Sequence, residues 1–163
     1  MNGKSCFFIG HREASDSLFP ALQESVETHI DECGVTEFIV GHYGGFDRLA
    51  ARAVKTAKQR HPEITLLLLL PYHPAECPIE TPEGFDNTYY PPGMEKVPRQ
   101  LAIVRANRYV VDRVDYLIAY AWHELSNAFE LVEYAKARER RGLINVTLLK
   151  SACNPSDNRL YYQ

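Results

Sequence analysis

The sequence predicts an α/β fold, and two features of the chain predict it. Short apolar runs alternate with stretches of helical period along most of its length. These runs lack polar alternation, which is typical of parallel strands buried on both faces. Right-handed crossovers then favour a three-layer, Rossmann-like, doubly wound sheet of about five parallel strands in the order 3-2-1-4-5, with helices on both faces.

Length and composition indicate a single globular domain over 1–163. Hydrophobic residues make up 45% of the chain and charged residues 24%, which argues against disordered and fibrous classes. The net charge of −3 provides no general attraction to nucleic acid or anionic membranes. No apolar run approaches the roughly 20 residues of a membrane span. The four cysteines are scattered, which is typical of reduced thiols and favours a cytoplasmic location.

The first half of the chain supplies three strands and two helices. The first strand ends at Gly10, and Ser15–Ser17 offers N-caps for the helix that follows. Gly34 stands where a C-cap glycine belongs. The predicted strands are 5–9, 36–40 and 65–70, and the predicted helices are 18–33 and 46–57.

The second half contains an irregular segment followed by two helices and two strands. Residues 72–97 are rich in proline and aromatic side chains and have no sustained period, so we expect an ordered lid-like insertion there. The predicted helices are 98–112 and 126–140, and the predicted strands are 115–120 and 144–149. The tail, 150–163, is polar and has no clear element.

Ligands of doubly wound sheets bind beyond the carboxyl ends of the strands, which places the candidate site. The second strand ends in Gly41-His42-Tyr43-Gly44-Gly45-Phe46-Asp47 and runs directly into a helix. Glycines before a helix N-terminus favour anion binding, although a tight turn alone also explains Gly44 and Gly45. Asp47 is suited to ribose hydroxyls, or merely to the positive end of the helix dipole.

Two further loops meet at the same edge. Gly10-His11-Arg12 places a guanidinium just past the first strand, where it would bind phosphate or form a surface ion pair. Ser126-Asn127-Ala128 opens the last helix and either caps it or offers N–H groups to a ligand. The third helix is locally basic, and we expect most of its arginines to form a solvated face: Arg99, Arg105, Arg108 and Arg113.

Metal and hydrolase motifs are not found. Four histidines collect at the carboxyl edge (His11, His42, His73 and His123), but none has the spacing of a zinc motif such as H-E-x-x-H. The chain has no G-x-S-x-G nucleophile elbow. We therefore expect no metal and no required cofactor.

Several of these motifs, taken together, resemble the SLOG superfamily of Rossmann-like proteins, and most closely its YpsA-like branch. The resemblance covers about residues 5–149 and is carried by Phe7-Phe8-Ile9-Gly10-His11-Arg12, Gly41 to Asp47, Pro92 to Pro98, Ala102-Ile103, Asn107 and Val114 to Tyr120. It implies a nucleotide or nucleotide-derived ligand, held by Gly10, His11, Arg12, Gly41, His42, Gly44, Gly45, Asp47, Asn107, Ser126 and Asn127. Ligand-sensing members of the superfamily make a sensor role the expected use.

The chain departs from the family pattern at two places. Arg105-Ala106-Asn107-Arg108 replaces the usual adjacent Arg-Asn, and Ser126-Asn127-Ala128 replaces a Gly-Gly-Ala turn. Of the glycine-rich motif of the LOG phosphoribohydrolases, Glu133 alone remains.

Three hypotheses follow. The leading one is a nucleotide-binding domain. The first alternative is a LOG-like hydrolase of nucleotide N-glycosidic bonds, with Glu133 and Arg105 as catalytic residues. The second is a DprA-like nucleic-acid-binding protein, which the net charge and the lack of any face dense in Lys and Arg argue against. Membrane partners are not expected, and homo-oligomerisation is left open.

Overall fold

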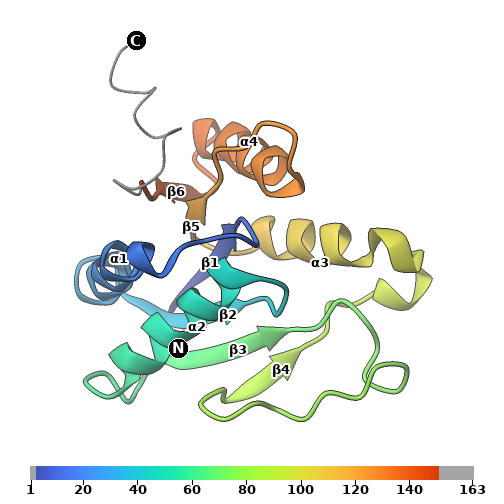
Figure 1. Cartoon of the computed structure of the whole chain (residues 1–163), viewed down its shortest axis with the longest axis horizontal. Coiled ribbons are helices and arrows are strands. Elements are labelled where there is room, and N and C mark those ends of the chain that lie inside the picture. Colours follow the sequence, from blue (N-terminus) through green and yellow to red (C-terminus); the bar gives the residue numbers. More distant parts are fainter. Residues whose placement is uncertain (1–2, 151–163) are drawn as a thin grey trace.

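The computed structural model describes residues 3–150 and contains one open sheet of six parallel strands. The strand order is β4-β3-β2-β1-β5-β6 (Figure 1). The strands are β1 Lys4–Gly10, β2 Val35–Val40, β3 Thr65–Leu69, β4 Asn87–Tyr89, β5 Tyr116–Tyr120 and β6 Asn145–Leu148. The five strands that the sequence predicts are all present in the predicted relative order, and β4 extends the sheet at one edge.

Helices cover both faces of the sheet, which confirms the three-layer architecture (Figure 1). The helices are α1 Phe19–Asp31, α2 Gly45–Lys58, α3 Ala102–Val111 and α4 Asn127–Arg140. Successive side chains of a strand point to opposite faces, so Phe8 packs with α1 and α2 whereas Phe7 packs with α3 and α4. Both phenylalanines are almost fully buried. The central strand β1 therefore anchors both halves of the core.

The segment 72–97 contains an edge strand that the sequence does not reveal. Strand β4 pairs in parallel with β3, and the backbone N–H of Leu70 donates to the carbonyl of Tyr89 at 2.8 Å. Asp86 fixes the entry to β4, because its Oδ2 accepts from the backbone N–H of Leu66 at 2.8 Å. A three-residue strand has too few side chains to show a period of two, which explains why the sequence pattern misses it.

The remaining sequence-based expectations concern the cysteines, the membrane and the tail. Cys6, Cys33 and Cys77 are free thiols. No helix between residues 3 and 150 combines the length and the apolar character needed to cross a bilayer. Apart from Lys150, the tail lies outside the described residues.

Candidate ligand-binding site

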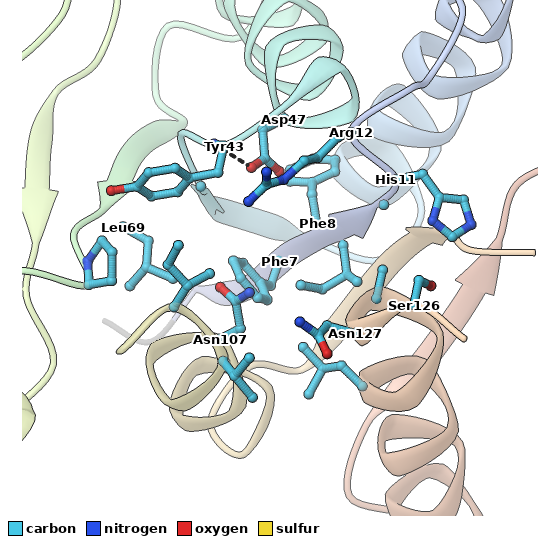
Figure 2. Close-up of a pocket in the computed structure, with 18 of the residues that line it drawn as sticks. Phe7, Phe8, His11, Arg12, Tyr43, Asp47, Leu69, Asn107, Ser126 and Asn127 are labelled. Atoms are coloured by element: carbon cyan, nitrogen blue, oxygen red, sulfur yellow. Dashed lines mark hydrogen bonds between the residues drawn. The ribbon is translucent and has the colours of Figure 1, made fainter. Parts of the chain in front are cut away.

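A cavity of about 410 Å³ opens at the carboxyl ends of β1 and β2, between the loops that follow them and helices α3 and α4 (Figure 2). Its volume is within the range of small-molecule sites. Its apolar walls include Phe7, Ile9, Leu69 and Leu131. Eight of the sequence-predicted binding residues line it: Gly10, His11, Arg12, Gly41, Asp47, Asn107, Ser126 and Asn127.

The polar side chains of the cavity come from two opposite sides. Arg12 projects from the loop after β1 and Asp47 from the first turn of α2, whereas Asn107 and Asn127 project from α3 and α4 (Figure 2). Among the described residues that line the cavity, Arg12 is the one guanidinium and Asp47 the one carboxyl group. Positive charge, a carboxyl group and the carboxamides of Gln100, Asn107 and Asn127 thus surround one space with apolar walls.

Asp47 is a buried acid in the first turn of α2. Its Oδ2 accepts a hydrogen bond from the backbone N–H of Tyr43 at 3.0 Å. Burial raises the pKa of Asp47 to about 6, and the Tyr43 N–H, His42 and Arg12 only partly oppose this increase. A cavity-lining carboxyl group that changes protonation near neutral pH is typical of functional sites.

At the N-terminus of α2, which the glycine motif marks as a phosphate site, protein carbonyls accept from the first two N–H groups. The N–H of Gly45 donates to the carbonyl of Arg12 at 2.8 Å, and the N–H of Phe46 donates to the carbonyl of His11 at 3.3 Å. Gly44 has φ +138°, and a Cβ there would lie 2.7 Å from the Cα of Arg12. The two glycines therefore let the β1–α1 loop pack onto the turn, and these N–H groups are not free for a phosphate.

The N-terminus of α4, in contrast, is open to the cavity. The Oγ of Ser126 accepts from the N–H of Phe129 at 3.1 Å and donates to the carbonyl of His123 at 2.8 Å, so Ser126 caps the helix. Within residues 3–150, the N–H groups of Asn127 and Ala128 have no hydrogen-bond partner. Both residues line the cavity. Free N–H groups at the positive end of a helix favour an anion.

His11 holds the loop that leads into α4. Its Nε2 accepts from the N–H of Trp122 at 2.7 Å and from the N–H of His123 at 3.1 Å. Two donors at Nε2 require that this nitrogen is unprotonated, so the ring proton resides on Nδ1. Burial, and then the nearby His123, lower the pKa of His11, which also favours the neutral ring. His11 thus positions the open helix terminus.

Three of the predicted binding residues do not line this cavity. His42 and Gly44 line a second cavity on the other side of Asp47, and Gly45 lies in the lining of neither. Residues 72–97 contribute no lining residue to the first cavity, whose wall on that side ends at Pro71, whereas Pro82 and Phe85 line the second.

The two candidate catalytic residues, Glu133 and Arg105, likewise do not line the cavity. Glu133 is exposed on α4 and pairs with Lys136 at 3.1 Å. Arg105 is exposed on α3. The other arginines of that region stack on tyrosine rings, as expected for a solvated face: Arg99 on Tyr72, Arg108 on Tyr134 and Arg113 on Tyr109.

Sequence reasoning missed the wall that α3 provides. Gln100, in the short 3-10 helix Arg99–Leu101 that leads into α3, and Ile103 and Val104 of α3 line the cavity together with Asn107. They precede Asn107 by seven, four and three positions, which is the spacing of one helix face. Extending the helical period back from Asn107 would have identified all three. Tyr43 was also missed, although it lies within the glycine motif.

The four histidines at the carboxyl edge are not among the described residues whose ligand atoms lie close enough to share an ion. His42 packs against Tyr43 and His73 against Tyr90, while His11 is committed to the β5–α4 loop. Among the described residues, the group whose ligand atoms lie close enough to share an ion is Glu27, Asp31 and His61. This group lies towards the amino ends of the strands, and Arg60 already pairs with Glu27.

No protein-family model matches this chain, and no curated protein matches its sequence.

Proposed function

We propose that this protein is a SLOG-type domain that binds a nucleotide or a nucleotide-derived ligand in the cavity between Arg12 and α4. The observation that supports the proposal is the combination of one guanidinium, one open helix N-terminus and apolar walls around about 410 Å³. An anionic group with an attached ring system matches these two kinds of surface. Use as a ligand sensor rests on fold analogy alone.

The chemistry of the lining supports a place for each part of such a ligand. The phosphate lies where Arg12 and the N–H groups of Asn127 and Ala128 are available. Asp47 accepts from ribose hydroxyls, and its buried carboxylate has spare acceptor capacity beyond the Tyr43 N–H. The carboxamides of Asn107 and Asn127 offer both donors and acceptors to the sugar or base.

The hydrolase and nucleic-acid alternatives gain less support from the geometry. Cleavage by Glu133 requires a carboxyl group at the cavity, but Glu133 is exposed and paired with Lys136. A DprA-like role requires a surface that tracks a phosphodiester backbone, whereas the cavity described above carries a single cation. Binding without bond cleavage is therefore the function we propose.

A thermal-shift experiment with AMP, ADP-ribose and NAD tests the proposal. A ligand at about 100 times its dissociation constant adds roughly 2.7 kcal/mol to the free energy of unfolding, which gives a clear rise in melting temperature. We expect this rise with at least one of the three ligands, and we expect Arg12→Ala to abolish it. Arg105→Ala is the matched control, because it removes an exposed cation outside the cavity.

Two results would contradict the proposal. One is no rise in melting temperature with any of the three ligands at millimolar concentration. The other is an equal loss in Arg12→Ala and Arg105→Ala, which would indicate nonspecific charge attraction. Release of free base from AMP that depends on Glu133 would instead favour the hydrolase.

A further inference from the structure

A second cavity, of about 580 Å³, lies along the outer side of α2. It is separated from the first by a wall that includes Gly41 and Asp47, which line both cavities. The turn of residues 82–85 closes its far side through Pro82 and Phe85. Nothing in the proposed function uses this space.

One face of α2 supplies this cavity with three cations. Arg48, Arg52 and Lys55 line it and follow one another at intervals of four and three residues, so they lie in a row on one helix face. Seven residues of helix extend over about 10 Å. These three cations form a short local row, although the net charge of the whole chain is −3.

The side chains of Lys55 and Arg52 are held in place by neighbouring groups. The stem of Lys55 packs on Gly84, where an added Cβ would lie 2.8 Å from Lys55 Cε, and its ammonium lies 4.9 Å from the centroid of the Phe85 ring. The Arg52 guanidinium stacks 4.1 Å from the ring centroid of Phe19. Both cations are thus ordered by aromatic rings rather than neutralised by carboxylates.

The carboxyl groups near the second cavity do not neutralise its three cations. Asp16 pairs with Arg48 at 3.1 Å, but both side chains are more than 60% exposed, so this pair is weak. Asp86 pairs with Lys58 instead of Lys55. Asp47 is buried within the dividing wall, and Glu83 lies on the turn but does not line the cavity.

We propose that this second cavity binds a small ligand that carries several linked phosphate groups, such as an inorganic oligophosphate. A row of cations about 10 Å long matches an anion whose charges are spread along a line better than a single phosphate. Arginine is the side chain best suited to bidentate contact with phosphate oxygens. The Lys55 ammonium lies over the face of the Phe85 ring, so this face is not available to stack on a base. The cavity therefore favours an anionic ligand without a base.

Isothermal titration of the full chain with tripolyphosphate at about 50 mM salt tests this site. We expect one equivalent to bind, and Arg52→Gln and Lys55→Gln each to weaken binding about fivefold, because each removes one ion contact and keeps the stem. Two variants serve as controls. Arg60→Gln removes a cation that follows α2 and pairs with Glu27, outside the cavity. Arg12→Ala disables the first cavity only.

Each control separates this site from another explanation. Equal weakening by Arg60→Gln would overturn the proposal in favour of net charge, and loss of binding in Arg12→Ala would place the ligand in the first cavity. A single-stranded oligonucleotide that binds more tightly than tripolyphosphate, with the same dependence on Arg52, would replace the small ligand by nucleic acid. Absence of any binding heat, together with no tripolyphosphate-induced rise in melting temperature, would also overturn it. Loss of tripolyphosphate binding in Arg12→Ala would extend the proposal on nucleotides to oligophosphates. The other three results leave that proposal unaffected.

Discussion

Helices α2 and α4 begin beside the same cavity, but their N-termini are in different states. The first N–H groups of α2 donate to the carbonyls of His11 and Arg12, so this terminus is closed by the β1–α1 loop. At α4, Ser126 caps the helix, and Asn127 and Ala128, whose N–H groups have no hydrogen-bond partner within residues 3–150, line the cavity. The difference shows that a glycine-rich turn before a helix does not by itself leave the N–H groups of that helix free for an anion.

The comparison also assigns different roles to substitutions at the two termini. At α2, close packing of two loops predicts effects on the free energy of unfolding. At α4, exposed N–H groups predict effects on ligand binding. A substitution of Asp47 should affect both the free energy of unfolding and ligand binding, since Asp47 lies in the first turn of α2 and lines the cavity.

The largest effect is expected for Gly44→Ala. Its φ of +138° belongs to a region that is essentially restricted to glycine, and the new Cβ would lie 2.7 Å from the Cα of Arg12. Strain and overpacking together should lower the free energy of unfolding by about 4 kcal/mol. The matched control is Gly34→Ala, which has φ +75° but open space around it. Chemical denaturation measures both, and equal costs would show that α2 is not closed by packing.

The next effect is expected for Asp47→Asn and depends on pH. The folded-state pKa of Asp47 is about 6, above its unfolded value near 3.9, so the native state loses stability as pH rises from about 4 to 6. Replacing the carboxyl group should therefore add about 3 kcal/mol at pH 8 and almost nothing at pH 4. The asparagine carbonyl still accepts from the Tyr43 N–H.

Denaturation curves of Asp47→Asn at both pH values provide the measurement. Asp16→Asn is the control, because the Asp16 side chain is 73% exposed and has no such burial cost. A pH-independent effect of Asp47→Asn would show that burial does not set the protonation of this group. Such a result would also remove one reason to regard Asp47 as functional.

A smaller effect is expected for His11→Ala, which disturbs the loop before α4. The substitution removes the acceptor of two backbone N–H groups, each worth about 1 kcal/mol. We expect the free energy of unfolding to fall by about 2 kcal/mol, with faster hydrogen exchange at Trp122 and His123. His73→Ala is the control, since His73 accepts from one N–H only, in a local turn. Unchanged exchange at Trp122 would contradict the positioning role of His11.

The smallest effect on stability is expected at Ser126. Ser126→Ala removes the N-cap and should cost about 1 kcal/mol. Ser126→Asp keeps a capping oxygen, so its stability should stay close to that of the wild type. Its negative charge beside the open N–H groups should nevertheless weaken AMP binding, which calorimetry would measure. Unchanged AMP affinity in Ser126→Asp would place the phosphate elsewhere in the cavity.

Local patterns in the sequence were sufficient for the architecture except for the edge strand β4. Apolar runs and helical periods located all five predicted strands and the four helices, because each pattern depends on residues within a few positions of one another. The handedness of crossovers then ordered the strands and predicted a candidate site at their carboxyl ends, where the structure has a cavity. Strand β4 was missed because three residues are too few for a period.

The same patterns were sufficient for part of the site. Arg12, Asp47 and Asn107 were predicted and line the cavity. The spacing of Arg48, Arg52 and Lys55 within the predicted helix indicates the cationic row on α2, whereas the net charge, which is a sum over the whole chain, does not. The helical period extended back from Asn107 likewise indicates the cavity wall formed by Gln100, Ile103 and Val104.

The sequence by itself determined which elements form, in what order they pair and where the loops meet. Only the tertiary structure decided which groups in those loops are free to bind. The N–H of Gly45 is closed by a carbonyl more than thirty residues earlier in the chain, and His11 holds a loop more than a hundred residues later. Hydrogen bonds between distant loops depend on how the loops approach each other in space, and no local period records that approach.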